Sequence, residues 1–186
     1  NFGLRLPSAL LGIASVYLLY LMGSILYSKT AGLIAAGLLG VTANHVAISR
    51  LGLQESYVIF FLLLASYFFI RALKKDTYLV WTGLALGLGL LAKYNVGIVI
   101  PVFLSYLMLY KREYLLNKKL WIGGMLVILV FSPVLIYNYK LYKAVGHFDF
   151  QLSFIFRQPH MEWQTEPGKE EFPTLGARAT QFLPNL

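Results

Sequence analysis

The sequence contains no cysteine, and charged residues are scarce. Without cysteine, this chain has no disulfide framework, no thiolate metal site and no cysteine nucleophile. Charged residues make up 13% of the sequence, about half the share usual in soluble proteins. Hydrophobic residues make up 58%, and the mean hydropathy is +0.66. This composition excludes an ordinary soluble domain.

Long uncharged stretches fill most of the chain, and the charges lie almost entirely between them. The stretches are residues 6–28, 30–49, 56–70, 77–92, 94–110 and 120–139. A helix needs about 20 mostly apolar residues to cross a bilayer. The first, second and sixth stretches reach that length, and Arg71, Lys93 and Lys111 can extend the other three because their long side chains reach the interface.

The sequence therefore predicts an all-α fold, a polytopic transmembrane helical bundle. The expected spans are about 6–27, 30–49, 54–72, 77–93, 95–110 and 120–139.

The basic residues indicate the orientation of these spans. If the loops alternate across six crossings, one side receives Lys29, Arg71, Lys74, Lys75, Lys111, Arg112, Lys118 and Lys119, and the other receives Arg5, Arg50 and Lys93. Cytoplasmic loops are enriched in Lys and Arg, so the first side is predicted to be cytoplasmic. Such placement also explains the net charge of +8 without a nucleic-acid partner.

Two regions are expected, a membrane core over 1–139 and an extracytoplasmic tail over 140–186. Phe148, Phe150, Leu152, Phe154 and Phe156 alternate as in a strand. Part of the same segment also fits a helical face, and an amphipathic segment at the membrane surface is the preferred interpretation.

Because the chain begins with Asn1 and has no signal-peptide pattern, we expect an internal fragment of a longer protein.

Glu55, Arg50 and Lys93 are predicted to lie at the same, outer membrane face. A carboxylate in a membrane segment is usually functional or paired, although Glu55 at a helix start could also be solvated and favoured by the helix dipole. Lys93 and Arg50 could bind a lipid phosphate through charge-assisted hydrogen bonds. Alternatively, Lys93 could be an interfacial lysine that sets the topology, and Arg50 could pair with Glu55.

The histidines predict no metal site. His45 lies within the second span, where a hydrogen bond to a neighbouring helix is the expected role. His147 and His160 have acidic neighbours, but the rest of a ligand set is missing. The sequence leaves open whether a divalent metal ion is needed. It also contains no Ser-His-Asp arrangement, phosphate-binding glycine loop or HExxH motif.

Several motifs in order resemble one family. They are R-L-P-S-A-L-L-G from Arg5, S-R-L-G-L-Q-E ending at Glu55, the glycine-rich stretch from Gly83 to Lys93-Tyr94, S-P-V-L-I-Y-N ending at Asn138, and S-F at Ser153. This series is similar to the protein-mannosyltransferase-like superfamily. Its members include dolichyl-phosphate-mannose-protein mannosyltransferases and aminoarabinose transferases, which are membrane glycosyltransferases of the GT-C fold. The resemblance covers roughly residues 4–158.

The resemblance implies transfer of a sugar, with inversion, from a polyprenyl-phosphate donor to a protein, lipid or glycan acceptor on the outer face. The family's main catalytic Asp would precede residue 1. Glu55 matches a second acidic position, where Asp is more usual, and would orient the acceptor or the nearby cations. Lys93 and Arg50 would stabilise the departing phosphate. Tyr94, Asn138 and Arg5 are further candidates for substrate binding.

These features predict an integral membrane enzyme of a bacterial or archaeal plasma membrane or of the ER, with an extracytoplasmic active site. Two other classes stay open. A transporter or lipid flippase usually places ionisable residues near the bilayer midplane and often has internal repeats. A non-catalytic subunit of a membrane complex would need the small-residue stripes but not Glu55 or Lys93.

Overall fold

The computed structural model describes residues 2–149, 152, 153 and 156, and it divides into two compact units, Asn1–Tyr137 and Asn138–Leu186. Every regular element in the described part is a helix, as the sequence predicts. The elements are α1 (Phe2–Leu26), α2 (Lys29–Val41), α3 (Ala43–Leu51), α4 (Gln54–Ala72), α5 (Tyr78–Ala92), η1 (Tyr94–Ile98), α6 (Val99–Tyr110), η2 (Arg112–Leu116) and α7 (Lys118–Val145). Helix α7 contributes to both units.

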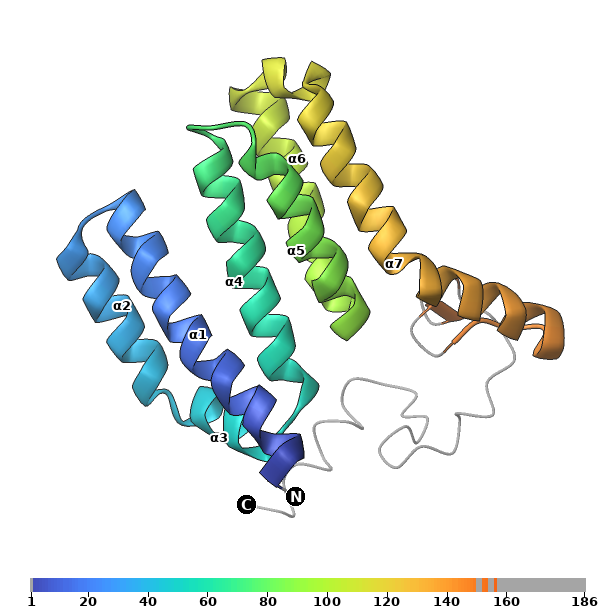
Figure 1. The fold of residues 1–186 in the computed structure, drawn as a ribbon, viewed down its shortest axis with the longest axis horizontal. Coiled ribbons are helices and arrows are strands. Elements are labelled where there is room, and N and C mark those ends of the chain that lie inside the picture. The colour runs from blue at the N-terminus through green and yellow to red at the C-terminus, as the bar shows by residue number, and fades with distance from the viewer. Residues whose placement is uncertain (1, 150–151, 154–155, 157–186) are drawn as a thin grey trace, which may run out of the picture. The chain divides into compact units, whose positions relative to one another are not determined.

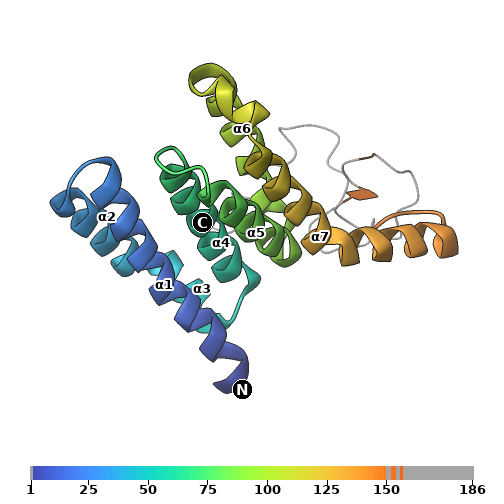
Figure 2. The same cartoon turned by 45° about the horizontal axis from the view of Figure 1, so that its top comes forward.

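In the first unit, α1 packs against α2, α3 and α4, and α4 packs in turn against α5. Figures 1 and 2 both show α1 between α2 and α4. A core of Ala65, Ala85, Leu86 and Val96 joins α4, α5 and η1. In a bilayer, helices associate through close packing rather than through the hydrophobic effect, which makes small residues at the contacts important.

Glycines set the closest helix contacts. A Cβ atom at Gly83 of α5 would collide with the backbone of Gly123 of α7, and one at Gly23 of α1 would lie 2.7 Å from the Cα of Gly32 of α2. Gly87 likewise lies against Val130. Gly32, Gly83 and Gly87 therefore act as close-packing positions, where only a residue without a side chain lets the neighbouring helix approach this far.

The predicted second span, 30–49, is not one straight helix. Helices α2 and α3 meet at an angle of 60°, because Thr42 between them is extended, with ψ at 116°. The Thr42 hydroxyl and its backbone N–H donate to the carbonyls of Leu38 and Leu39, at 2.6 Å and 3.2 Å. These bonds satisfy the end of α2 and leave α3 free to take a new direction.

The helix lengths match the six predicted spans in part. Within the described residues, α1, α4 and α7 are long and apolar enough to cross a membrane, and the bent pair α2–α3 adds a fourth if it forms one span. Helix α5 and the run Tyr94–Tyr110 are apolar but shorter. Six crossings therefore stay a prediction.

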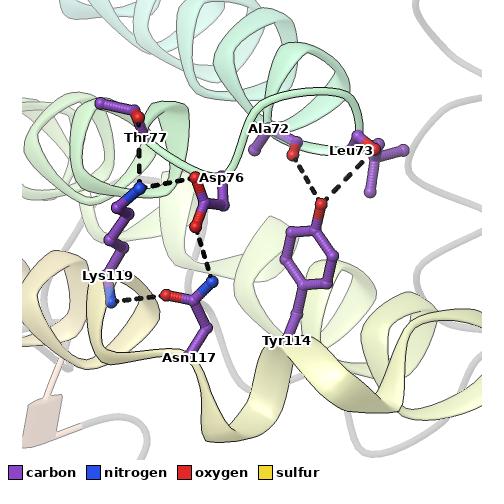
Figure 3. A network of polar contacts seen from close by, with 7 residues as sticks. All are labelled: Ala72, Leu73, Asp76, Thr77, Tyr114, Asn117 and Lys119. Carbon is purple, nitrogen blue, oxygen red and sulfur yellow. Dashed lines mark hydrogen bonds and ion pairs between the residues drawn. The ribbon is translucent and has the colours of Figure 1, made fainter.

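A polar network fixes the turn between α4 and α5 to the start of α7 (Figure 3). The Asp76 carboxylate accepts hydrogen bonds from the Lys119 ammonium at 2.6 Å and the Asn117 amide at 2.9 Å. The Tyr114 hydroxyl lies 3.2 Å from the carbonyl oxygen of Ala72. These contacts hold two chain reversals together at one end of the first unit.

In the second unit, Asn138 organises the chain after α7. Its amide donates to Asp149 at 3.1 Å and accepts from the Asp149 N–H at 2.8 Å. Asn138 is buried, as is Ser153, whose hydroxyl donates to the Phe148 carbonyl. The predictions for Phe150, Phe154, His160 and the rest of 157–186 lie outside the described residues.

Candidate functional site

Glu55 lies in the first turn of α4, at the predicted membrane boundary. Gly52, with φ at 77°, ends α3 in the left-handed conformation, and Leu53 is extended before α4 begins. The left-handed conformation costs little free energy for glycine, so the chain reverses here without strain. The helix start also favours a carboxylate, because the unpaired N–H groups there carry partial positive charge.

Lys93 lies at the end of α5 and is paired with Glu55. Its ammonium nitrogen is 2.9 Å from the Glu55 Oε1 atom, and the two side chains are 27% and 42% exposed. Lys93 itself is extended, with φ at −165° and ψ at 138°. The ion pair therefore joins two helix ends that lie 38 residues apart in the sequence, and it keeps one side open to water.

Gly89 lets the chain fold back directly after Lys93. A Cβ atom at Gly89 would lie 2.7 Å from a methyl group of Val96 and 2.9 Å from the Cβ of Phe61. Val96 is fully buried. The tight packing of η1 on α5 and α4 thus determines where Lys93 points.

The helix starts around Glu55 are held by buried polar contacts. Ser8 of α1 donates its hydroxyl hydrogen to Ser56 of α4 at 2.7 Å, and both are fully buried. Nε2 of His45 lies 3.2 Å from the carbonyl oxygen of Gly12, so the predicted hydrogen bond of His45 to a neighbouring helix is confirmed. The sequence analysis did not single out Ser8 and Ser56. The available signal was their position, since Ser8 comes three residues after Arg5 and Ser56 directly follows Glu55.

The other predicted site residues make different contacts. Arg50 and Arg5 are exposed, and neither side chain has a hydrogen bond or ion pair to another described residue. Arg50 thus does not form the alternative pair with Glu55. The Tyr94 ring packs edge-on against Phe131 at 5.6 Å. Asn138 belongs to the second unit, where its side chain holds Asp149.

No three His, Asp or Glu side chains gather in a metal-binding group within the part of the chain that the structure describes. The arrangement around Glu55 is instead one carboxylate and one ammonium at an accessible helix end. An ammonium has three donors, and Glu55 uses one of them. Lys93 therefore retains two donors for an anionic ligand such as a phosphate.

The long apolar helices, with polar side chains gathered at their ends, define an integral membrane protein. Residues 1–137 match the family model described as "Dolichyl-phosphate-mannose-protein mannosyltransferase". The chain belongs to this family.

Two curated relatives come from Bacillus subtilis (strain 168). "Putative mannosyltransferase YkcB" is 34% identical over 105 residues, which cover 54% of this chain and 14% of the relative. "Putative mannosyltransferase YycA" is 34% identical over 132 residues, which cover 67% of this chain and 18% of the relative. The chain thus matches less than a fifth of the length of either relative. No solved structure matches it significantly.

Proposed function

We propose that the full-length protein is an inverting glycosyltransferase that moves a sugar from a polyprenyl-phosphate donor to a protein, lipid or glycan acceptor. The family supports the reaction class, and the contact between Lys93 and Glu55 is the observation that carries the proposal. It holds a cation with free donors at a helix end, and under the proposed topology this end would lie at the membrane boundary, beside the phosphate of a lipid-linked sugar.

The proposed reaction exchanges one bond at the anomeric carbon. The acceptor hydroxyl or amine attacks from the face opposite the phosphate, the bond between carbon and phosphate oxygen breaks, and polyprenyl phosphate leaves. The acceptor proton passes to a carboxylate base, the Asp that the family resemblance implies upstream of residue 1. Two donors of Lys93 neutralise the charge that develops on the leaving phosphate.

Glu55 is proposed to act through Lys93. By accepting one of its hydrogen bonds, Glu55 fixes the position of the ammonium before the substrate binds, so less reorganisation is needed during the reaction. The exposed guanidinium of Arg50 has no partner among the described residues, so it is available to bind the same phosphate at a second oxygen.

The membrane arrangement is also a proposal. Six crossings, with the cytoplasm at the basic turns around Lys75 and Lys111, would put Glu55 and Lys93 on the extracytoplasmic face. Helix α5 has 15 residues and is about 22 Å long, so it needs the long side chain of Lys93 to reach the interface. The membrane would be a bacterial or archaeal plasma membrane or the ER.

A transfer assay tests this function. Membranes containing the full-length protein are given a polyprenyl-phosphate sugar labelled in the sugar, and the label is followed into protein, lipid and glycan fractions. Covalent label in an acceptor, with release of polyprenyl phosphate, is the expected result. Movement of intact donor across vesicles without transfer would establish a flippase instead, and neither activity would favour a non-catalytic subunit.

A further inference from the structure

A cluster of cations lines a cavity at the other end of α4 from Glu55. The cavity has a volume of about 360 Å³, and its walls are Ile25 of α1 and Arg71, Lys74, Lys75 and Tyr78 around the α4–α5 turn. Three of these five side chains are basic. The tendency of cytoplasmic loops to be basic explains the number of cations at this end, but it does not require them to surround a cavity.

Arg71 is held in a fixed orientation within this cluster. Its two terminal nitrogens donate to the hydroxyl oxygens of Tyr67 at 3.3 Å and Tyr78 at 3.0 Å. Its guanidinium carbon lies 5.8 Å and 5.0 Å from the centres of the same two rings. A guanidinium has five N–H donors, so several stay available to an anion, and the rings preserve its geometry.

The nearby negative groups are directed elsewhere. Asp76, the carboxylate of the α4–α5 turn, is bound by Lys119 and Asn117 (Figure 3). The carbonyl oxygens of Ala72 and Leu73, which carry partial negative charge at the end of α4, accept from the Tyr114 hydroxyl. In the described part of the chain, the ion pairs involve Lys93, Lys111 and Lys119, and none involves Arg71, Lys74 or Lys75. The cavity therefore has three positive charges that form no ion pair with any residue the structure describes.

We propose that this cavity binds the phosphate of an anionic phospholipid. The cavity lies at the ends of the apolar helices α1 and α4, which is headgroup depth when these helices cross a membrane, and Ile25 gives it an apolar wall beside the cations. An anionic phospholipid matches both the cations and the apolar wall. Its phosphate oxygens would contact the cations, and its acyl chains would lie along the helices. The leaflet concerned is the cytoplasmic one under the proposed topology, but the site itself does not depend on that orientation.

The test is lipid binding by the purified full-length protein, measured by native mass spectrometry with phosphatidylglycerol. The cavity variant is Arg71→Gln/Lys74→Gln/Lys75→Gln. The matched control, Lys29→Gln/Arg112→Gln/Lys118→Gln, removes the same charge at the same end of the helices but outside the cavity. We expect the cavity variant to bind phosphatidylglycerol more than about tenfold more weakly than wild type, and the control to change by less than about twofold.

Further arms separate the rival explanations. The double variant Lys74→Gln/Lys75→Gln keeps the contacts of Arg71 with both tyrosines, so it replaces the triple variant if that one fails to fold. We expect its affinity for phosphatidylglycerol to fall about threefold or more. Equal losses in the cavity and control variants would show diffuse attraction and overturn the proposal. Equally tight binding of glycerol phosphate or of phosphatidylcholine would overturn it as well, since the first indicates a free-phosphate site and the second no charge selectivity. These readouts do not depend on sugar transfer.

Discussion

At the scale of single residues, the neighbours of Asp76 shift the pKa of its carboxyl. The hydrogen bond from the Lys119 ammonium, followed by the one from Asn117, holds the pKa of the Asp76 carboxyl below its usual value. A carboxyl with a lowered pKa in the folded state stabilises the fold above its unfolded pKa of about 4, and this contribution disappears as the pH falls through the folded value.

Asp76→Asn should therefore lower the thermal stability at neutral pH and make less difference as the pH drops below about 4. Thermal unfolding in detergent between pH 3 and pH 7 measures the gap between variant and wild type. Glu113→Gln is the control, since the Lys111–Glu113 pair is 3.6 Å long and Glu113 is 66% exposed. A gap that is the same at every pH would mean that Asp76 is not held by its charge.

The pairing of Glu55 shows how far the sequence leads at this scale. Its motif predicted a carboxylate at a helix start and near cations, and the structure places it so. The choice of partner was not predictable, because Arg50 is five residues away in sequence whereas Lys93 is 38 residues away. The partner depends on the turn at Gly52 and on the packing of Gly89 against Val96.

At the scale of elements, the contact between α5 and α7 should tolerate no added atom at Gly123. A Cβ atom there would lie 2.6 Å from the carbonyl oxygen of Leu79, whereas one at the adjacent Gly124 would meet nothing within 4 Å. Gly123→Ala should destabilise the protein by about 1–3 kcal/mol through overpacking. Gly124→Ala should be neutral or slightly stabilising, because alanine favours the helix. Thermal unfolding of the two variants compares them, and equal stabilities would contradict this close contact.

The elements themselves were largely predictable, since uncharged runs of helical length leave few alternatives in a bilayer. The break at Thr42 was not. A threonine within an apolar run fits a continuous helix, and the 60° change of direction depends on the ψ of that one residue and on the contact of α3 with Gly12. Such a contact is set by the tertiary packing rather than by local sequence.

At the scale of the whole molecule, the absence of cysteine allows the proposed six crossings to be tested directly. Single cysteines are introduced at Leu53 and Asn95, which should face outward, and at Lys74 and Leu116, which should face the cytoplasm; any cysteine elsewhere in the full-length protein is replaced first. A membrane-impermeant maleimide should label the first two in intact cells and the other two only after permeabilisation. Labelling of Asn95→Cys only after permeabilisation would show that α5 does not cross the membrane.

The most direct test of the proposed function is sugar transfer by full-length Lys93→Ala and Glu55→Gln compared with wild type at equal expression. The control is Lys111→Ala, which breaks the pair between Lys111, at the junction of α6 and η2, and Glu113 of η2, away from Lys93. We predict that kcat/KM falls at least about tenfold in both site variants, roughly 1.4 kcal/mol of lost transition-state stabilisation, and stays near wild type in the control. Wild-type transfer by Lys93→Ala and Glu55→Gln would remove this ion pair from the active site.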